Sequence, residues 1–107
     1  MVLAWLRKWW YGRPVRRLER VRVVMYTRQG CHLCADAWRL LERQQQQYGF
    51  ALEAVDVDAD ADLTARYGLE VPVVAVDGKV RFRGIVNAHL LERLLRHLAS
   101  SRPPLAG

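Results

Sequence analysis

The residues of this chain whose type and spacing could do chemistry are Cys31 and Cys34. A cysteine thiolate is a nucleophile, and a second thiol three residues away can displace whatever the first has bound. We expect Cys31 to attack a disulfide, to form a mixed disulfide with it, and to be released by Cys34. A purely structural disulfide is the weaker interpretation, because so short a loop constrains little of the unfolded chain.

The elements around the pair predict how it is positioned. Residues 21–26 are rich in valine and predict a strand, Gly30 ends the connection, and apolar spacing predicts a helix over 32–48. Cys31 therefore stands at a helix N-terminus, where free N–H groups and the helix dipole lower a thiol's pKa. His32, between the cysteines, either favours the thiolate as a partial cation or is simply an exposed polar residue.

The rest of the chain alternates strands and helices. The pattern predicts a strand at 50–57, a short helix at 61–67 capped by Asp60, and strands at 71–76 and 80–83 joined by an Asp77-Gly78 hairpin turn. A last helix begins after Asn87. The order β-α-β-α-β-β-α predicts an α/β fold, a four-stranded mixed sheet with helices on both faces.

Length and composition divide the chain into three parts. Its 107 residues are enough for one domain. We expect a basic, tryptophan-rich N-terminal extension over 1–20, a folded domain over 21–99 and a flexible tail over 100–107. Within the extension, apolar spacing predicts a short amphipathic helix at about residues 2–11.

The excess positive charge lies in that extension. The net charge is +6, and residues 1–22 hold seven basic residues against Glu19 alone. A neutral domain argues against a nucleic-acid partner. Tryptophan mixed with arginine and lysine fits peripheral contact with a membrane surface through residues 1–20. The alternatives are contact of this extension with nucleic acid, a helix packed on the domain, a disordered extension or a mis-assigned start. With two cysteines and no secretory pattern, we expect a cytoplasmic protein, and a monomer.

No metal site is predicted. Zinc needs about four ligands, and the two cysteines with His32, His89 and His97 do not supply one clear set. Alternating aspartates at 56, 58, 60 and 62 lack the glycine and glutamate of a calcium-binding loop. We interpret them as strand exit and helix capping.

The segment around the cysteines resembles a known family. Tyr26-Thr27-Arg28-Gln29-Gly30-Cys31-His32-Leu33-Cys34 is similar to the active-site segment of glutaredoxins, and its His-Leu interior resembles the bacterial and plant glutaredoxin-like proteins. Over about residues 21–99 the resemblance implies a thioredoxin fold, Cys31 as the attacking thiolate and Cys34 as the resolving thiol. It also implies a cis Val71–Pro72 peptide, a Val71 backbone that pairs with the substrate, and Arg28 as the receptor of glutathione's carboxylate.

Two departures bear on glutathione. His32 replaces the proline of common glutaredoxins, and Gly84 with Asn87 replaces a Gly-Gly pair followed by an acid, at the end that would bind glutathione's amine. We therefore expect an enzyme that reduces protein disulfides or glutathione mixed disulfides, with no tightly bound cofactor and glutathione as a candidate co-substrate. The alternatives are a non-catalytic adaptor that docks through its basic arm, and an iron–sulfur cluster carrier.

Overall fold

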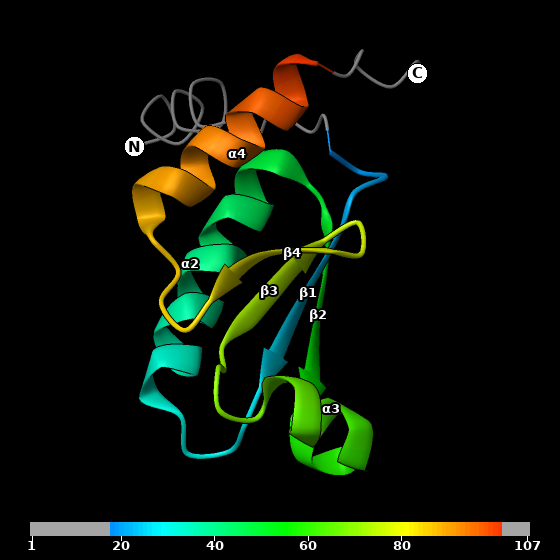
Figure 1. Ribbon diagram of the computed structural model, residues 1–107. Coiled ribbons are helices and arrows are strands. Elements are labelled where there is room, and N and C mark those ends of the chain that lie inside the picture. The colour runs from blue at the N-terminus through cyan, green and yellow to red at the C-terminus, as the bar shows by residue number, and fades with distance from the viewer. Residues whose placement is uncertain (1–17, 102–107) are drawn as a thin grey trace, which may run out of the picture.

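The computed structural model describes residues 18–101, and its elements follow the predicted order (Figure 1). The short 3₁₀ turn η1 is the element that the sequence pattern did not predict. The expected helix at 2–11 and most of the expected tail lie outside the described residues. The elements are β1 (Arg22–Thr27), α2 (His32–Tyr48), β2 (Ala51–Asp56), η1 (Val57–Ala59), α3 (Ala61–Tyr67), β3 (Val73–Val76), β4 (Lys79–Arg83) and α4 (Ala88–Ser100).

The four strands form one mixed sheet in the order β2-β1-β3-β4. β1 runs parallel to β2 and antiparallel to β3, and β3 pairs antiparallel with β4. Helices α2 and α4 pack together on one face of this sheet (Figure 1). The predicted fold class is therefore confirmed.

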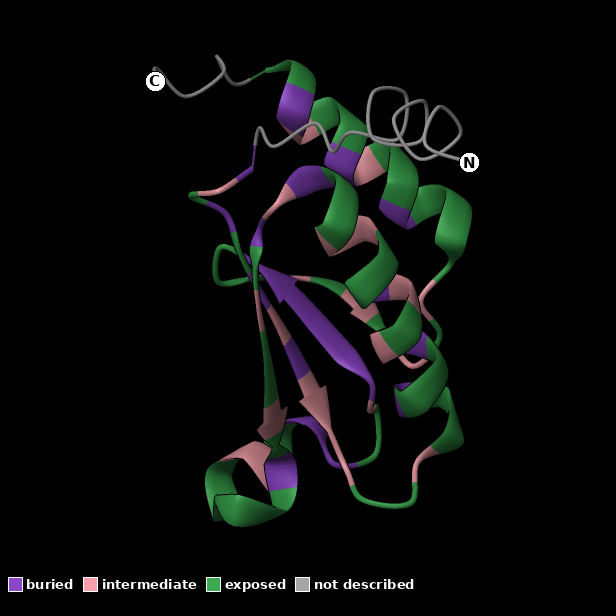
Figure 2. Ribbon diagram, turned by 180° about the vertical axis from the view of Figure 1, so that it is seen from behind, coloured by how far each residue is buried: buried purple, intermediate pink, exposed green. Residues whose placement is uncertain are grey.

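The main core lies between the sheet and these two helices. Val23 and Met25, two residues apart on β1, point inward and meet Leu41 of α2 together with Leu91 and Leu95 of α4; all five are almost fully buried. Figure 2 shows buried positions on the strands and on the helices beside them. Period-two burial in the strand and period-3.6 burial in the helices give each element one apolar side. Each fully buried leucine contributes roughly 1.5–3 kcal/mol.

A smaller core on the opposite face of the sheet holds α3. Tyr67 of α3 packs with Val57 and Val73, and its ring lies 4.7 Å from that of Tyr26, centroid to centroid. Tyr26 is the neighbour of Met25 on β1, so its side chain points to the other face. Helices thus cover both faces, as predicted.

The predicted turn and caps are present. Asp77 and Gly78 both have positive φ, 50° and 82°, as a two-residue hairpin turn requires. The Asn87 side chain accepts a hydrogen bond from the Leu90 N–H at 3.0 Å and caps α4. Gly49, with φ of 80°, ends α2 in the left-handed conformation.

The folded part of the chain includes Leu18. This side chain is 0% exposed within the main core, and its N–H donates to the Tyr48 carbonyl at the end of α2, at 3.1 Å. Leu18 stands in the stretch expected to form the extension, so part of that stretch belongs to the domain core. Among residues 18–101, no helix is long and apolar enough to cross a membrane.

The buried position of Leu18 generates a stability prediction. We expect Leu18→Ala to lower the free energy of unfolding by about 2–5 kcal/mol, because it removes a fully enclosed side chain and leaves a cavity. Leu69→Ala is the matched control, since Leu69 is 99% exposed, and its effect should stay within about 0.5 kcal/mol. Urea denaturation measures both. Equal, small effects would mean that Leu18 does not belong to the core.

Candidate functional site

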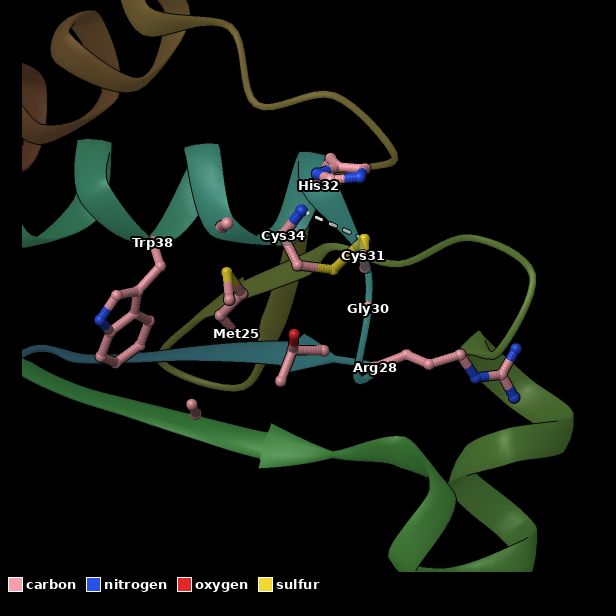
Figure 3. A pocket seen from close by; sticks show the side chains of 10 residues that line it. Met25, Arg28, Gly30, Cys31, His32, Cys34 and Trp38 are labelled. Carbon is pink, nitrogen blue, oxygen red and sulfur yellow. Dashed lines mark hydrogen bonds between the residues drawn. A yellow bond between two sulfur atoms is a disulfide. The ribbon is translucent and has the colours of Figure 1, made fainter.

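The two cysteines are joined by a disulfide at the start of α2 (Figure 3). Cys31 is the N-cap residue of this helix, with extended backbone angles. Its Sγ accepts a hydrogen bond from the Cys34 N–H, with 3.1 Å between nitrogen and sulfur. A sulfur atom therefore takes the place of the hydroxyl or carboxylate oxygen that usually caps a helix.

The two sulfurs differ in access. Cys31 is partly exposed, whereas Cys34 is 3% exposed and belongs to the main core. Cys31 Sγ is therefore open to an incoming thiol or disulfide, whereas Cys34 lies behind it. This asymmetry is the one that a nucleophile and a resolving thiol need.

The Val71–Pro72 peptide is cis, as the family resemblance implies, and directly precedes β3. Tyr26 of β1 pairs with Val73, so the antiparallel register places Pro72 opposite Thr27, near the start of the cysteine loop. The carbonyl of Pro72 accepts a hydrogen bond from the Gly84 N–H at 2.9 Å. The loop after β4 thereby holds the Pro72 segment, while His32 lies exposed on the first turn of α2 beside the disulfide (Figure 3).

Arg28 points away from the disulfide, toward α3 (Figure 3). Its Nε and Nη2 donate to the two carboxylate oxygens of Asp58 at 3.0 and 2.8 Å, and its Nη1 donates to the Gly68 carbonyl at 3.0 Å. The guanidinium therefore ties the cysteine loop to η1 and to the end of α3. A carboxylate of the chain itself occupies the fork that the resemblance assigns to glutathione.

Gly68 makes room for this arrangement. A Cβ at this position would lie 2.5 Å from the Thr64 carbonyl oxygen and 3.1 Å from Nη2 of Arg28. Gly68 ends α3 with right-handed backbone angles. Here glycine is required for space rather than for a left-handed turn.

Asp58 is the residue at this site that sequence reasoning missed. Two of the alternating aspartates are caps, as interpreted: Asp56 accepts from the Asp58 N–H, and Asp60 from the Asp62 N–H. Asp58 instead pairs with Arg28. The hydrogen bond from Arg28 holds the pKa of Asp58 below its usual value, and the same bond raises the pKa of the guanidinium.

An open cavity of about 510 Å³ lies beside the disulfide. Both cysteines line it, together with Met25 of β1, Trp38 of α2 and Ala54 of β2 (Figure 3). The sequence contained no signal for this cavity. Among the described residues, no group of three or more His, Cys, Asp or Glu side chains could hold a metal ion.

The Asp58 pKa generates a pH prediction. Because this pKa is lower in the folded chain than in the unfolded one, the ion pair stabilises the fold above about pH 4, and that contribution is lost as the pH falls through the lowered folded value. Asp58→Asn should lower the unfolding free energy at pH 7, and its difference from the wild type should shrink as the pH falls below about 4. Denaturant titration at several pH values measures this.

The control for this prediction is Asp36→Asn, which breaks an exposed pair between Asp36 and Arg39 one turn apart on α2. We expect a smaller loss from it. A difference between wild type and Asp58→Asn that is the same at pH 7 and pH 2 would contradict the assigned role of Asp58.

Solved structures with this fold include two bacterial proteins. A Nitrosomonas europaea protein has a TM-score of 0.61 and 28% identity, covering 69% of this chain and 89% of its own. A structural genomics target from X. campestris has a TM-score of 0.59 and 31% identity, covering 70% and 96%. The oxidised thioredoxin of Plasmodium falciparum, at 20% identity and a TM-score of 0.55, covers 74% and 81% and shows the fold alone.

The chain is also similar in sequence to a curated relative. This uncharacterized protein of Mycobacterium tuberculosis is 29% identical over 92 residues, which is 81% of this chain and 95% of that protein. The model of the glutaredoxin-like domain (DUF836) matches residues 22–96, from β1 into α4. A thioredoxin-like fold with a Cys-x-x-Cys pair favours a redox function. With its cysteine pair at the N-terminus of α2 and the match spanning most of the described fold, the chain belongs to the glutaredoxin-like (DUF836) family.

Proposed function

We propose that this protein is a thiol–disulfide oxidoreductase that reduces disulfides through Cys31 and Cys34. The observation that carries the proposal is the asymmetry of the pair: the accessible sulfur caps a helix and the buried one lies directly behind it. A scaffold disulfide would not need one sulfur exposed and hydrogen-bonded at a helix N-terminus. The family and the thioredoxin fold support the same reaction class.

The reaction begins with both cysteines reduced. The Cys31 thiolate attacks one sulfur of the substrate disulfide, forming a mixed disulfide and releasing the other substrate sulfur as a thiolate, which takes up a proton. Cys34 then loses its proton and attacks Cys31 Sγ, closing the Cys31–Cys34 disulfide and releasing the second substrate thiol. Two electrons pass from the protein to the substrate, and an external thiol reductant returns them.

The N-terminus of α2 supplies the electrostatics of the first step. The Cys34 N–H donates to Cys31 Sγ at 3.1 Å, and the partial positive charge of the helix end stabilises an anionic sulfur. In the resolving step the same helix turn brings the two sulfurs together. The negative charge then moves onto the departing sulfur of the substrate, where water and the substrate protein stabilise it.

Protein disulfides fit this site better than glutathione mixed disulfides do. The Arg28 fork is filled by Asp58, so a glutathione carboxylate would have to displace an internal partner. Glutathione is retained in the proposal as a candidate reductant and co-substrate. The Val71 backbone beside the cis proline is the proposed partner for the substrate main chain, as the family resemblance implies.

The cellular setting is part of the proposal. A pair of reactive thiols suits a reducing compartment, so we place the protein in the cytoplasm, as a monomer. The proposed contact of residues 1–20 with a membrane surface concerns mainly residues outside the described part of the chain.

The two cysteines should respond differently to substitution. Cys31→Ser should abolish reduction of a disulfide-bonded peptide, because the nucleophile is gone. Cys34→Ser should retain attack and accumulate a stable Cys31–peptide mixed disulfide, because the resolving thiol is absent. Turnover assays and intact-protein mass spectrometry read out both results, and each variant is the matched control of the other. Activity retained in Cys31→Ser would overturn the proposal.

Equilibration in glutathione redox buffers provides an independent test. We expect the mass to fall by two hydrogens at one defined potential, with Cys31 and Cys34 linked. Transient addition of one glutathione would support glutathione as co-substrate. Two thiols that stay free throughout the series would reject the oxidoreductase and favour the non-catalytic adaptor; colour on anaerobic purification would favour the cluster carrier.

A further inference from the structure

We propose that the open cavity beside the disulfide binds a large apolar side chain of the substrate protein, close in sequence to the substrate cysteine. The inference rests on the proposed function and adds a specificity site to it. The cavity shares Cys31 and Cys34 with the reaction centre, so a group that enters it is held next to the reacting sulfur.

The walls of the cavity come from α2 and from two strands. The N-cap residue Cys31 and, within α2, Ala35 and Trp38 recur at the spacing that keeps side chains on one helix face. On the sheet, Met25 of β1 stands directly beside Ala54 of β2 in the parallel register. Helix and strands thus approach each other with the cavity between them (Figure 3).

Small side chains keep this space open. Leu52 and Ala54 are two residues apart on β2, so their side chains lie on the same face of the strand. Leu52 packs against the main core, whereas Ala54 is exposed. β2 is an edge strand, so nothing flanks Ala54 on its outer side within the sheet of the described residues. A volume of about 510 Å³ is within the range of cavities that bind ligands.

The lining selects an apolar occupant. Met25, Trp38 and the two alanines present carbon and sulfur, and Trp38 offers a flat aromatic wall. The polar side chains of the lining belong to Thr27, Arg28 and His32, and of these Arg28 is already paired with Asp58. A charged group pressed against Met25 and Trp38 would lose water against an apolar wall, whereas a leucine or phenylalanine would lose only unfavourable contact with water.

The position of the cavity fixes where the occupant must come from. The cavity lies over β1 and β2, while the cis proline directly precedes β3, on the other side of β1. A substrate held at Cys31 therefore meets Pro72 on one side and the cavity on the other. Side chains of an extended chain alternate between its two sides, so we assign the occupant to the residue two positions from the substrate cysteine, whose side chain lies on the same side as that cysteine.

A pair of peptide disulfides tests the inference. The peptides are identical except for leucine or serine two residues from the cysteine, and kcat/KM is measured for each. We expect the wild type to prefer the leucine peptide by about 10-fold. Ala54→Leu, which fills the cavity, should reduce this preference to about 2-fold or less, and Trp38→Ala, which removes a wall, should also lower it.

Ala51→Leu is the matched control, because Ala51 is an exposed alanine on the same strand whose side chain points to the opposite face. It should keep both the activity and the preference, and circular dichroism should show every variant folded. Reduction of neither peptide by the wild type would reject the proposed function itself. Equal reduction of both would reject the cavity proposal alone.

Two further outcomes would also overturn it. A preference that survives in Ala54→Leu would mean that the apolar group binds elsewhere. A change in the sedimentation of Ala54→Leu, with no peptide preference in the wild type, would assign the cavity to contact between copies of this chain.

Discussion

The hydrogen bond from the Cys34 N–H to Cys31 Sγ makes the accessible sulfur of the disulfide the cap of α2. A helix end leaves several N–H groups without an internal partner, and here one of them is satisfied by the sulfur that we propose as the nucleophile. The position of that sulfur consequently depends on how α2 is held. Leu41, together with Leu91 and Leu95 of α4, provides that support, since these residues fix the helix against the sheet. The core and the site are thus coupled through one helix.

A second constraint acts on the loop that leads into α2. Arg28 joins it to Asp58 and Gly68, which are 30 and 40 residues further along the chain. This contact ties the cysteine loop to η1 and to the end of α3, next to the smaller core around Tyr67. It also gives Arg28 a structural partner in place of the carboxylate that the family resemblance assigns to it. The family resemblance singled out Arg28, but its partner Asp58 became evident only from the fold.

Local signals predicted most of the elements. The bounds of α2, the Asp77-Gly78 turn and the Asn87 cap follow from patterns a few residues long, and these predictions are confirmed. Contacts between distant segments were not predictable in the same way. Leu18 stands among arginines, so composition grouped it with the extension, although its side chain fills the core.

In the candidate site, too, local patterns predicted some features, and contacts between distant segments produced the others. The place of Cys31 at a helix N-terminus followed from the strand and helix periods on either side of it. Asp58 lies in a run of aspartates that all look like capping residues, and its partner is on another element. The cavity arises because Ala54 is small where a larger side chain would fit, and the space left by a small residue has no signature in a single sequence.

The anchoring of Leu18 has a consequence for how this domain is connected to anything ahead of it. Leu18 is bound to the last turn of α2, whereas the cysteines stand at the first turn. α2 has 17 residues, so these two points lie about 25 Å apart along its axis. Whatever precedes residue 18 is therefore joined to the end of the helix remote from the sulfurs. A label placed directly at residue 18 would accordingly be attached about 25 Å along the helix from the disulfide.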